Sequence, residues 1–268
     1  MRQQKLWMIG IAALSLSACA TTSQYTSGAD YLARYNTKSA YSAPTSPNSI
    51  STPAIDSEIR EIAAIEPNLE FPARIGLARI ERGQLIGVPH DEAEYWRASA
   101  DRLGHGFGQF IPVSPLVAEM FGNGKPHFKG NVVNHIRRGA ARQHLDYVIA
   151  YEVNHKSESQ KNELGIADLS ILGLFVLPSR NVDVQSTASA ILMDVRNGYP
   201  YLTGSTFADK SGISTLVGRS DKKERLKDAS RIVAVDKISD EFAQGLKELK
   251  LVSDGIKLAE QRGQSGGT

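Results

Sequence analysis

The chain contains a single cysteine, Cys19, and this constrains its fold more than any other residue. With no second thiol, an internal disulfide cannot form, and a metal site built on several cysteines is excluded. The fold must therefore be held together by its hydrophobic core. A chain of 268 residues with 41% apolar side chains is large enough for one or two domains with such a core.

The residues before Cys19 have the three parts of a secretory signal. A short basic start is followed by an uncharged, mostly apolar run over residues 6–16 and then by two small residues. The apolar run is shorter than the roughly 20 residues that a membrane-spanning helix needs. We therefore predict that residues 1–18 are a signal peptide that is removed.

The four residues Leu16-Ser17-Ala18-Cys19 resemble the lipobox of bacterial lipoproteins. This resemblance implies that the thiol of Cys19 receives a diacylglyceryl group, and that the new amino group is acylated, as with palmitate, after cleavage before the cysteine. Two or three acyl chains on one residue give stable attachment. In lipoproteins of this type, a residue other than aspartate after the cysteine, here Ala20, implies export to the outer membrane, and the resemblance therefore implies a domain that faces the periplasm. The alternative is an ordinary signal peptide with a stray cysteine.

The charge of the mature chain argues against a nucleic-acid partner. Loss of residues 1–18 removes Arg2 and Lys5 and leaves 29 basic and 29 acidic side chains, so the formal net charge is zero. Binding to nucleic acid needs a concentrated basic face. We therefore expect the protein to bind no nucleic acid.

Composition divides the mature chain into three parts. Residues 19–55 begin with the lipidated cysteine and are rich in Ser, Thr, Asn and Pro, which is typical of a flexible tether. Residues 56–252 contain the periodic apolar segments and are expected to form one globular α/β domain. Residues 253–268 are predicted to form a polar tail that frays.

The apolar patterns predict an α/β (α+β) fold, a single mixed sheet with helices packed on it, in the order β-α-β-α-β-β-β-α. The strands are predicted at residues 72–80, 107–113, 145–153, 182–195 and 199–207. The helices are predicted at residues 91–103, 131–144 and 221–249. Asp91 and Glu94 have the spacing of a capping box for the first of these helices. Asn197-Gly198 is the strongest hairpin turn signal.

Three segments in this order resemble the periplasmic α/β domain shared by the curli-secretion lipoprotein family and the amino-terminal domains of the Tol–Pal β-propeller proteins. Residues 73–78 resemble its first strand, residues 146–153 its central strand, and residues 190–198 the strand that ends in an aspartate and a turn glycine. By order of elements, the resemblance covers about two-thirds of the mature chain. It implies a mixed sheet with helices, and such a topology does not fix a function.

The sequence contains no recognisable catalytic, cofactor or metal motif. A Gly-x-Ser-x-Gly elbow is absent, and the glycines of residues 104–108 lack the lysine of a phosphate loop. The six histidines form no His-Glu-x-x-His pattern, and His135 and His144 are nine residues apart, which is not a chelating spacing. We therefore expect no cofactor, no metal and no enzymatic activity, and lipid attachment at Cys19 is the one site that we predict.

The run at residues 169–178 is the most apolar part of the mature chain, and we expect the segment 166–180 to contact a protein partner or another copy of the chain. The lipobox-like sequence, the lack of a catalytic motif and this apolar segment favour a membrane-anchored, non-catalytic binding or assembly module. One alternative is a subunit of an outer-membrane secretion or pore complex, although residues 169–178 lack the alternation of a membrane β-hairpin. A second alternative is a periplasmic hydrolase, whose clustered Ser, His and Asp side chains only a structure would reveal.

Overall fold

A computed structural model describes residues 20–38, 59–120, 132–161, 180–214 and 219–265. The predicted signal peptide, Cys19 and residues 39–58 lie outside these ranges. So do residues 162–179, which include nearly all of the predicted contact segment 166–180. Within the described ranges, no helix combines the length and the hydropathy needed to cross a membrane.

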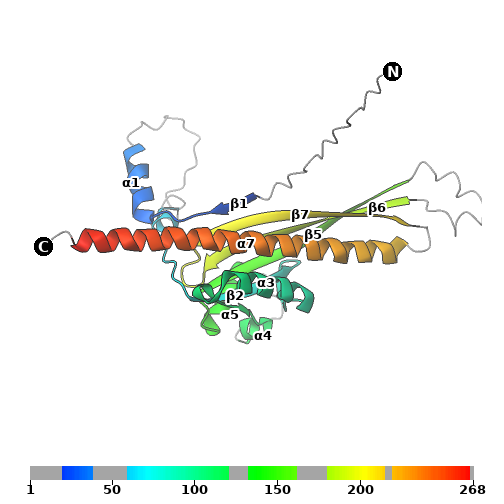
Figure 1. Ribbon diagram of the computed structural model, residues 1–268, viewed down its shortest axis with the longest axis horizontal. Helices are drawn as coiled ribbons and strands as arrows, with labels where there is room; N and C mark the ends of the chain where they lie inside the picture. The colour runs from blue at the N-terminus through cyan, green and yellow to red at the C-terminus, as the bar shows by residue number, and fades with distance from the viewer. Residues whose placement is uncertain (1–19, 39–58, 121–131, 162–179, 215–218, 266–268) are drawn as a thin grey trace, which may run out of the picture.

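Seven strands form one sheet in the order β1-β7-β6-β5-β2-β3, and β4 also pairs with β2 (Figure 1). The strands are β1 (Ala20–Ser23), β2 (Ala73–Glu81), β3 (Gln84–Ile86), β4 (Gly108–Pro112), β5 (Tyr147–Lys161), β6 (Arg180–Asp194) and β7 (Pro200–Ser214). β2 is parallel to β4 and β5, and the other pairs of these strands are antiparallel. The predicted single mixed sheet is confirmed.

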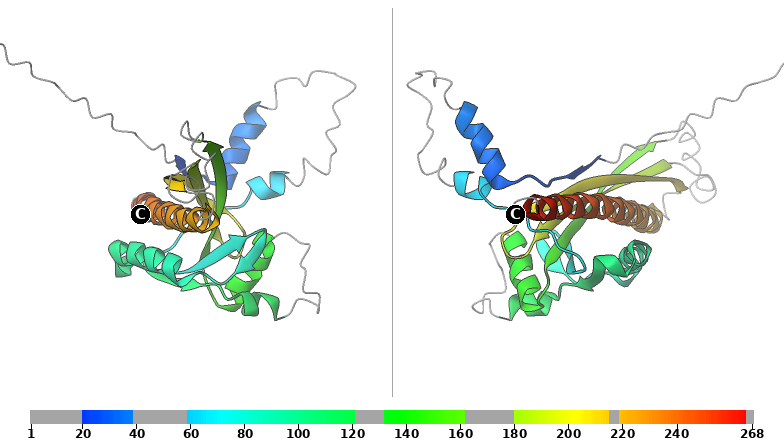
Figure 2. Two further views of the ribbon diagram at one scale, coloured as in Figure 1. Left: turned by 90° about the vertical axis from the view of Figure 1, so that its right-hand side faces the viewer. Right: turned by 60° about the vertical axis from the view of Figure 1, so that its left-hand side comes forward.

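Helices cover both faces of this sheet. The helices are α1 (Gly28–Lys38), α3 (His90–Leu103), α4 (Pro115–Glu119), α5 (Val132–Arg142) and α7 (Arg219–Ser265), with a helical turn at 59–63 and a 3₁₀ turn, η1 (His105–Phe107). α3 and α7 pack on one face, and α4 and α5 pack on the other. Figure 2 shows α7 nearly end-on against the sheet, with α1 standing away from it.

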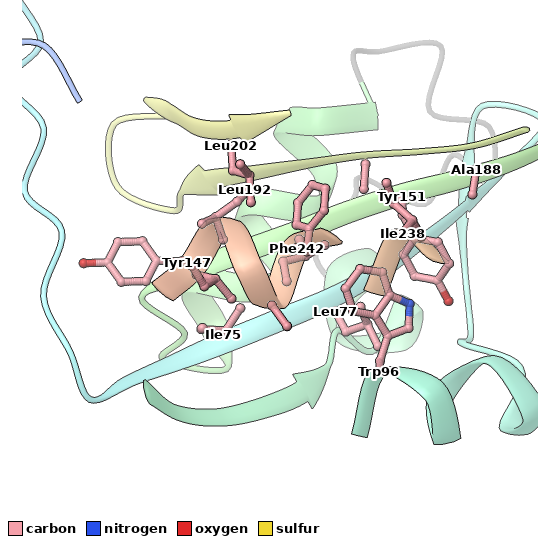
Figure 3. Close-up of a cluster of buried hydrophobic side chains, with 14 of the residues drawn as sticks. Ile75, Leu77, Trp96, Tyr147, Tyr151, Ala188, Leu192, Leu202, Ile238 and Phe242 are labelled. Atoms are coloured by element: carbon pink, nitrogen blue, oxygen red, sulfur yellow. The ribbon is translucent and has the colours of Figure 1, made fainter. Parts of the chain in front are cut away.

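The central strand β5 is buried on both faces, which explains its continuous apolar sequence. Ile149 and Tyr151 belong to the core under α3 and α7, whereas Val148 and Ala150 belong to the core under α4 and α5. In Figure 3, Tyr151 lies in the first core beside Trp96 of α3 and residues of α7. The Trp96 and Tyr151 ring centroids are 5.3 Å apart.

The strand β6 shows the alternation that the sequence predicts, and α7 accounts for it. Val184, Ser186 and Ala188 are buried on the face that α7 covers. Thr187 and Ser189 point to the opposite face, where they are only partly buried. From Asp183 to Ser189, β6 thus has one face under α7 and one polar face. Farther along the strand, Ile191 and Met193 pack in the core under α4 and α5.

Three boundaries differ from the sequence prediction. β5 and β7 are each 15 residues long and end at Lys161 and Ser214, beyond the ends predicted at residues 153 and 207. α7 runs to Ser265, so most of the predicted polar tail is helical. β5 pairs with β6 at every position from Tyr147 to Lys161, and β7 pairs with β6 as far as Ser214. Polar residues join a ladder when their neighbours already pair.

The predicted capping box of α3 is wrong. Pro89 is the N-cap residue, and no side chain caps the helix. Glu94 instead lies 3.5 Å from the exposed His90 ring, and Asp91 binds an arginine of α7. The helix begins one residue earlier than predicted, and a proline next to its first turn has a backbone angle suited to this position.

The first half of the predicted tether also differs from the prediction. Residues 20–23 form β1 on the edge of β7, and residues 28–38 form α1. A polar segment adopts this structure because β7 has unpaired backbone groups at its edge, which a short strand satisfies. Residues 39–55 of the predicted tether lie outside the described residues.

We predict that Gly108→Ala destabilises the protein by about 2 kcal/mol or more. Gly108 has a φ angle of 99°, and a Cβ atom there would lie 1.8 Å from the carbonyl oxygen of Ala73, its partner in β2. Equilibrium urea unfolding of the full chain measures the change. Gly106→Ala is the matched control, because a Cβ atom at Gly106 meets no atom within 4 Å. Equal stability of the two variants would contradict the prediction.

Candidate functional site

The edge of the sheet next to Cys19 is the first candidate site. β1 begins with Ala20, the residue that follows Cys19, and pairs Ala20 with Ser205 and Ser23 with Leu202. The backbone N–H of Gln24 continues this pairing by donating to the carbonyl of Tyr201 at 2.8 Å. Ordered pairing therefore starts one residue after the predicted lipid attachment point.

Aromatic and polar contacts fasten the segment after β1 to the domain. The rings of Tyr25 and Tyr201 stack with centroids 6.5 Å apart, and the Thr26 N–H donates to the Tyr199 hydroxyl at 3.2 Å. Glu66 then accepts the Ala29 N–H at 2.7 Å, in the first turn of α1. This backbone hydrogen bond lowers the pKa of Glu66. A carboxylate at a helix N-terminus also interacts favourably with the helix dipole.

Two buried tyrosines hold the chain that leads into β2. The Tyr201 hydroxyl accepts the Asn68 N–H at 2.9 Å. The Tyr147 hydroxyl accepts the Glu70 N–H at 2.7 Å and donates to the Asn68 carbonyl at 2.9 Å. Burial raises the pKa of Tyr147 to about 12, so its hydroxyl stays protonated and can donate. Together with Tyr25 and Tyr199, these side chains form an aromatic group at the end of the sheet where β5 and β7 begin.

Followed backward from Ser23 to Ala20, β1 runs along β7 toward the end of the long strands where β5 and β6 are joined. From Ser23 back to Ala20, the partners on β7 run from Leu202 to Ser205, toward Ser214. Ser214 pairs with Arg180, which directly follows the connection 162–179. The nine residues from Ser205 to Ser214 span about 30 Å at the rise of a strand. The chain thus enters β1 from the direction in which β5 and β6 are joined.

A buried polar cluster around Glu92 is the second candidate site. Glu92, in the first turn of α3, has no solvent exposure. Its carboxylate accepts hydrogen bonds from Arg79 Nε of β2 at 2.9 Å, from the Tyr151 hydroxyl of β5 at 2.8 Å and from Arg231 of α7 at 2.7 Å. Arg231 also donates to Asp91 at 2.6 Å. One carboxylate thereby joins two strands and two helices.

The charges of this cluster stabilise one another. The hydrogen bond from Arg231 lowers the pKa of Asp91. Burial disfavours the charged form of Arg231, but its hydrogen bonds to Asp91 and Glu92 outweigh burial, so its pKa is raised. Burial and the charge of Glu92 raise the pKa of Tyr151. The shifts in pKa thus favour the charged forms of Asp91 and Arg231 and the neutral form of Tyr151.

We predict that Glu92→Ala lowers the free energy of unfolding by about 3–5 kcal/mol, because it leaves the buried Arg79 without its carboxylate. Thermal or urea unfolding of the full chain measures this loss. Glu94→Ala, in the same helix turn, removes an exposed carboxylate and should change stability by less than about 0.5 kcal/mol. A similarly small loss of stability in Glu92→Ala would contradict the role of Glu92 in holding the two strands and two helices together.

A serine and a histidine on neighbouring strands come together as they do in some hydrolases. His155 Nδ1 lies 2.7 Å from Ser186 Oγ, and Ser186 Oγ lies 2.5 Å from Ser230 Oγ of α7. Ser186 and Ser230 are fully buried under the helix. A nucleophile must reach its substrate, and α7 covers this hydroxyl. The geometry gives the group a packing role between β5, β6 and α7.

We predict that His155 makes the protein less stable as pH falls below about 6.5, its ordinary pKa. Burial and the positive charges of Lys227 and Arg231 lower the pKa of His155, and the charge of Asp228 only partly opposes this. Between the lowered and the ordinary pKa, the unfolded chain binds more protons than the folded protein, so the free energy of unfolding rises with pH. Urea unfolding at several pH values should show a shallower slope for His155→Gln. Equal slopes would contradict the prediction.

A cleft of about 550 Å³ lies between α3 and β4. Its lining combines the apolar side chains of Leu77, Trp96 and Phe110 with the polar side chains of Asp101 and His105. Apolar walls with a few polar groups are typical of sites that bind small molecules or side chains. Across the described residues, no three potential metal-binding side chains come together. The cleft has the character of a binding surface.

The structure places several sequence-predicted residues outside any shared site. Cys19 and most of the segment 166–180 lie beyond the described residues. His135 and His144 are on α5 and in the turn after it, the first buried and the second exposed. The Glu92 cluster was not predicted, because Glu92 stands among other acidic residues with no pattern that marks it as buried. The pairing of His155 with Ser186 spans two strands and leaves no signature in the sequence.

Comparisons with known proteins give similarities of fold. No family model and no curated protein matches the chain. Similar solved structures include a minor lipoprotein from Acinetobacter baumannii, with 8% identity, TM-score 0.35, and 69% of this chain and 96% of that chain covered. The PelC dodecamer from Paraburkholderia phytofirmans has 13% identity, TM-score 0.30 and coverages of 67% and 91%. Rare lipoprotein B from Shewanella oneidensis has 10% identity, TM-score 0.25 and coverages of 69% and 98%. These similarities assign no function to this chain.

Proposed function

We propose that the protein is a lipid-anchored envelope lipoprotein that acts as a non-catalytic binding or assembly module. The observation that carries this proposal is the position of Cys19. It ends a lipobox-like sequence, and β1 begins at the very next residue. The lipid on Cys19 would therefore be joined to the sheet without an intervening linker.

This arrangement limits how the domain is oriented on the membrane. A lipid that is followed directly by a paired strand holds the β1–β7 edge of the sheet close to the headgroups. The contacts of Tyr25 with Tyr201 and of Glu66 with Ala29 hold the segment after β1 on the domain, so this segment does not act as a flexible tether. A module held in this way presents its remaining surfaces, including the cleft between α3 and β4, to the periplasm.

The geometry of the described residues favours a binding role over a catalytic role. Ser186 is the serine next to a histidine, and it is buried beneath α7. The buried carboxylate of Glu92 already accepts from Arg79 of β2, Arg231 of α7 and the Tyr151 hydroxyl of β5. The cleft between α3 and β4 is open to a ligand, and its lining combines apolar side chains with the polar side chains of Arg97, Asp101 and His105. The segment 166–180 supplies a further contact surface for a partner protein in this proposal.

We expect Cys19→Ala to abolish incorporation of labelled palmitate and to move the protein out of the membrane fraction or leave it unprocessed. Membrane fractionation with separation of inner and outer membranes measures this, and the unaltered protein is expected with the outer membrane. The control Cys19→Ala with Thr22→Cys keeps one thiol on β1 and should behave like Cys19→Ala alone. If the Cys19→Ala variant still partitions with membranes at mature size, the prediction of lipid attachment at Cys19 is wrong.

The same extracts test the role as a module. The native mass of the lipidated protein in mild detergent is compared with that of a version lacking residues 1–19. A monomer or dimer in both forms is the expected result. A ring of many copies that forms only with the lipid would replace the module with the pore-complex alternative.

A further inference from the structure

The C-terminal end of α7 extends past the sheet and presents an apolar face with no described partner. Figure 1 shows this end projecting beyond the strands. We name this face the C-terminal stripe, and its members are Leu251, Val252, Gly255, Ile256, Leu258 and Ala259. Leu251 is 73% exposed and Leu258 is 56% exposed. At about 100° per residue, these positions share one side of the helix.

The opposite side of the same helix end is polar and faces the domain. Ser253 donates to the carbonyl of Leu69 at 2.9 Å, and Lys250 pairs with Asp254 at 3.0 Å. The C-terminal stripe is therefore not the continuation of the face that packs on the sheet. Large exposed apolar side chains that gather on one face mark an interaction surface.

We propose that the C-terminal stripe binds the C-terminal stripe of a second copy, with the two helices antiparallel and crossing at Gly255. Exposed Glu248 and Arg262 stand at the two ends of the stripe, each seven residues from Gly255. A two-fold axis at Gly255 places Glu248 of one copy opposite Arg262 of the other, twice. In a parallel pair, equal charges would meet at both ends. The charges thus select the antiparallel arrangement.

The side chains at the centre allow the helices to approach closely. Val252, Gly255 and Ala259 are three and then four residues apart, which is the spacing of a helix–helix seam, and Leu251 and Leu258 flank it. A Cβ atom at Gly255 would meet no atom within 4 Å, so the surface there is open. The small residue leaves room for a second backbone. Because the interface is isologous, one surface is sufficient to form the pair.

Cysteine cross-linking tests the crossing point. In the full chain carrying Cys19→Ala, an introduced cysteine is the only thiol, and the result does not depend on lipid attachment. Gly255→Cys should give a disulfide-linked dimer under mild oxidation, since a two-fold axis brings the two positions within disulfide range. Lys257→Cys, about 200° around the helix, is the matched control and should stay monomeric. Equal cross-linking at both positions, or none at Gly255, would overturn the proposal.

Charge reversal tests the antiparallel register on the same full chain, with the dimer followed by analytical ultracentrifugation in detergent. Glu248→Arg and Arg262→Glu should each raise the dimer dissociation constant by about tenfold, and the double reversal should restore it. A double variant that dimerises as weakly as the single variants overturns the pairing.

A variant at Leu258 tests whether the stripe binds lipid instead. If Leu258→Asp releases the protein from lipid vesicles and leaves its native mass unchanged, the stripe binds a lipid surface, and the proposal is overturned.

Discussion

The packing of α7 along the three long strands is the constraint on which the rest of the structure depends. Strands of 15 residues are about 50 Å long, and β5, β6 and β7 all have this length. Their apolar face needs a cover of similar length. The 47-residue α7 is about 70 Å long, so it covers the strands and continues beyond them. The C-terminal stripe lies on that surplus.

The Glu92 cluster holds α7 and α3 in one arrangement on the sheet. Apolar packing alone lets a long helix slide along its strands with little change in buried area. A carboxylate that accepts from Arg79, Tyr151 and Arg231 at once has its hydrogen-bond geometry satisfied in one position only. Buried ion pairs contribute little net stability compared with apolar side chains, but the loss of one partner is costly. The cluster therefore fixes register more than it adds stability.

Sequence reasoning succeeded where a pattern repeats and failed where a contact joins distant segments. β5 was predicted because its aromatic and branched residues are typical of a buried strand, and β6 was predicted from its alternation. β1 was missed because a short run of Ala, Thr and Ser is as common in linkers as in edge strands. Glu92 and Ser186 were missed because each acts through partners on other elements. Whether Cys19 carries a lipid stays a prediction, because the structure does not describe it.

The anchor and the C-terminal stripe together restrict how a pair of copies could sit on a membrane. A two-fold axis that relates antiparallel helices is perpendicular to those helices. For the lipids of both copies to enter one bilayer, that axis must be normal to the membrane, so α7 must lie roughly parallel to it. β7 runs alongside α7 (Figure 1), and β1 pairs along β7, so the strand that follows Cys19 would also lie along the surface. If Cys19 carries the predicted lipid, this orientation also places β1, which begins at Ala20, close to the headgroups.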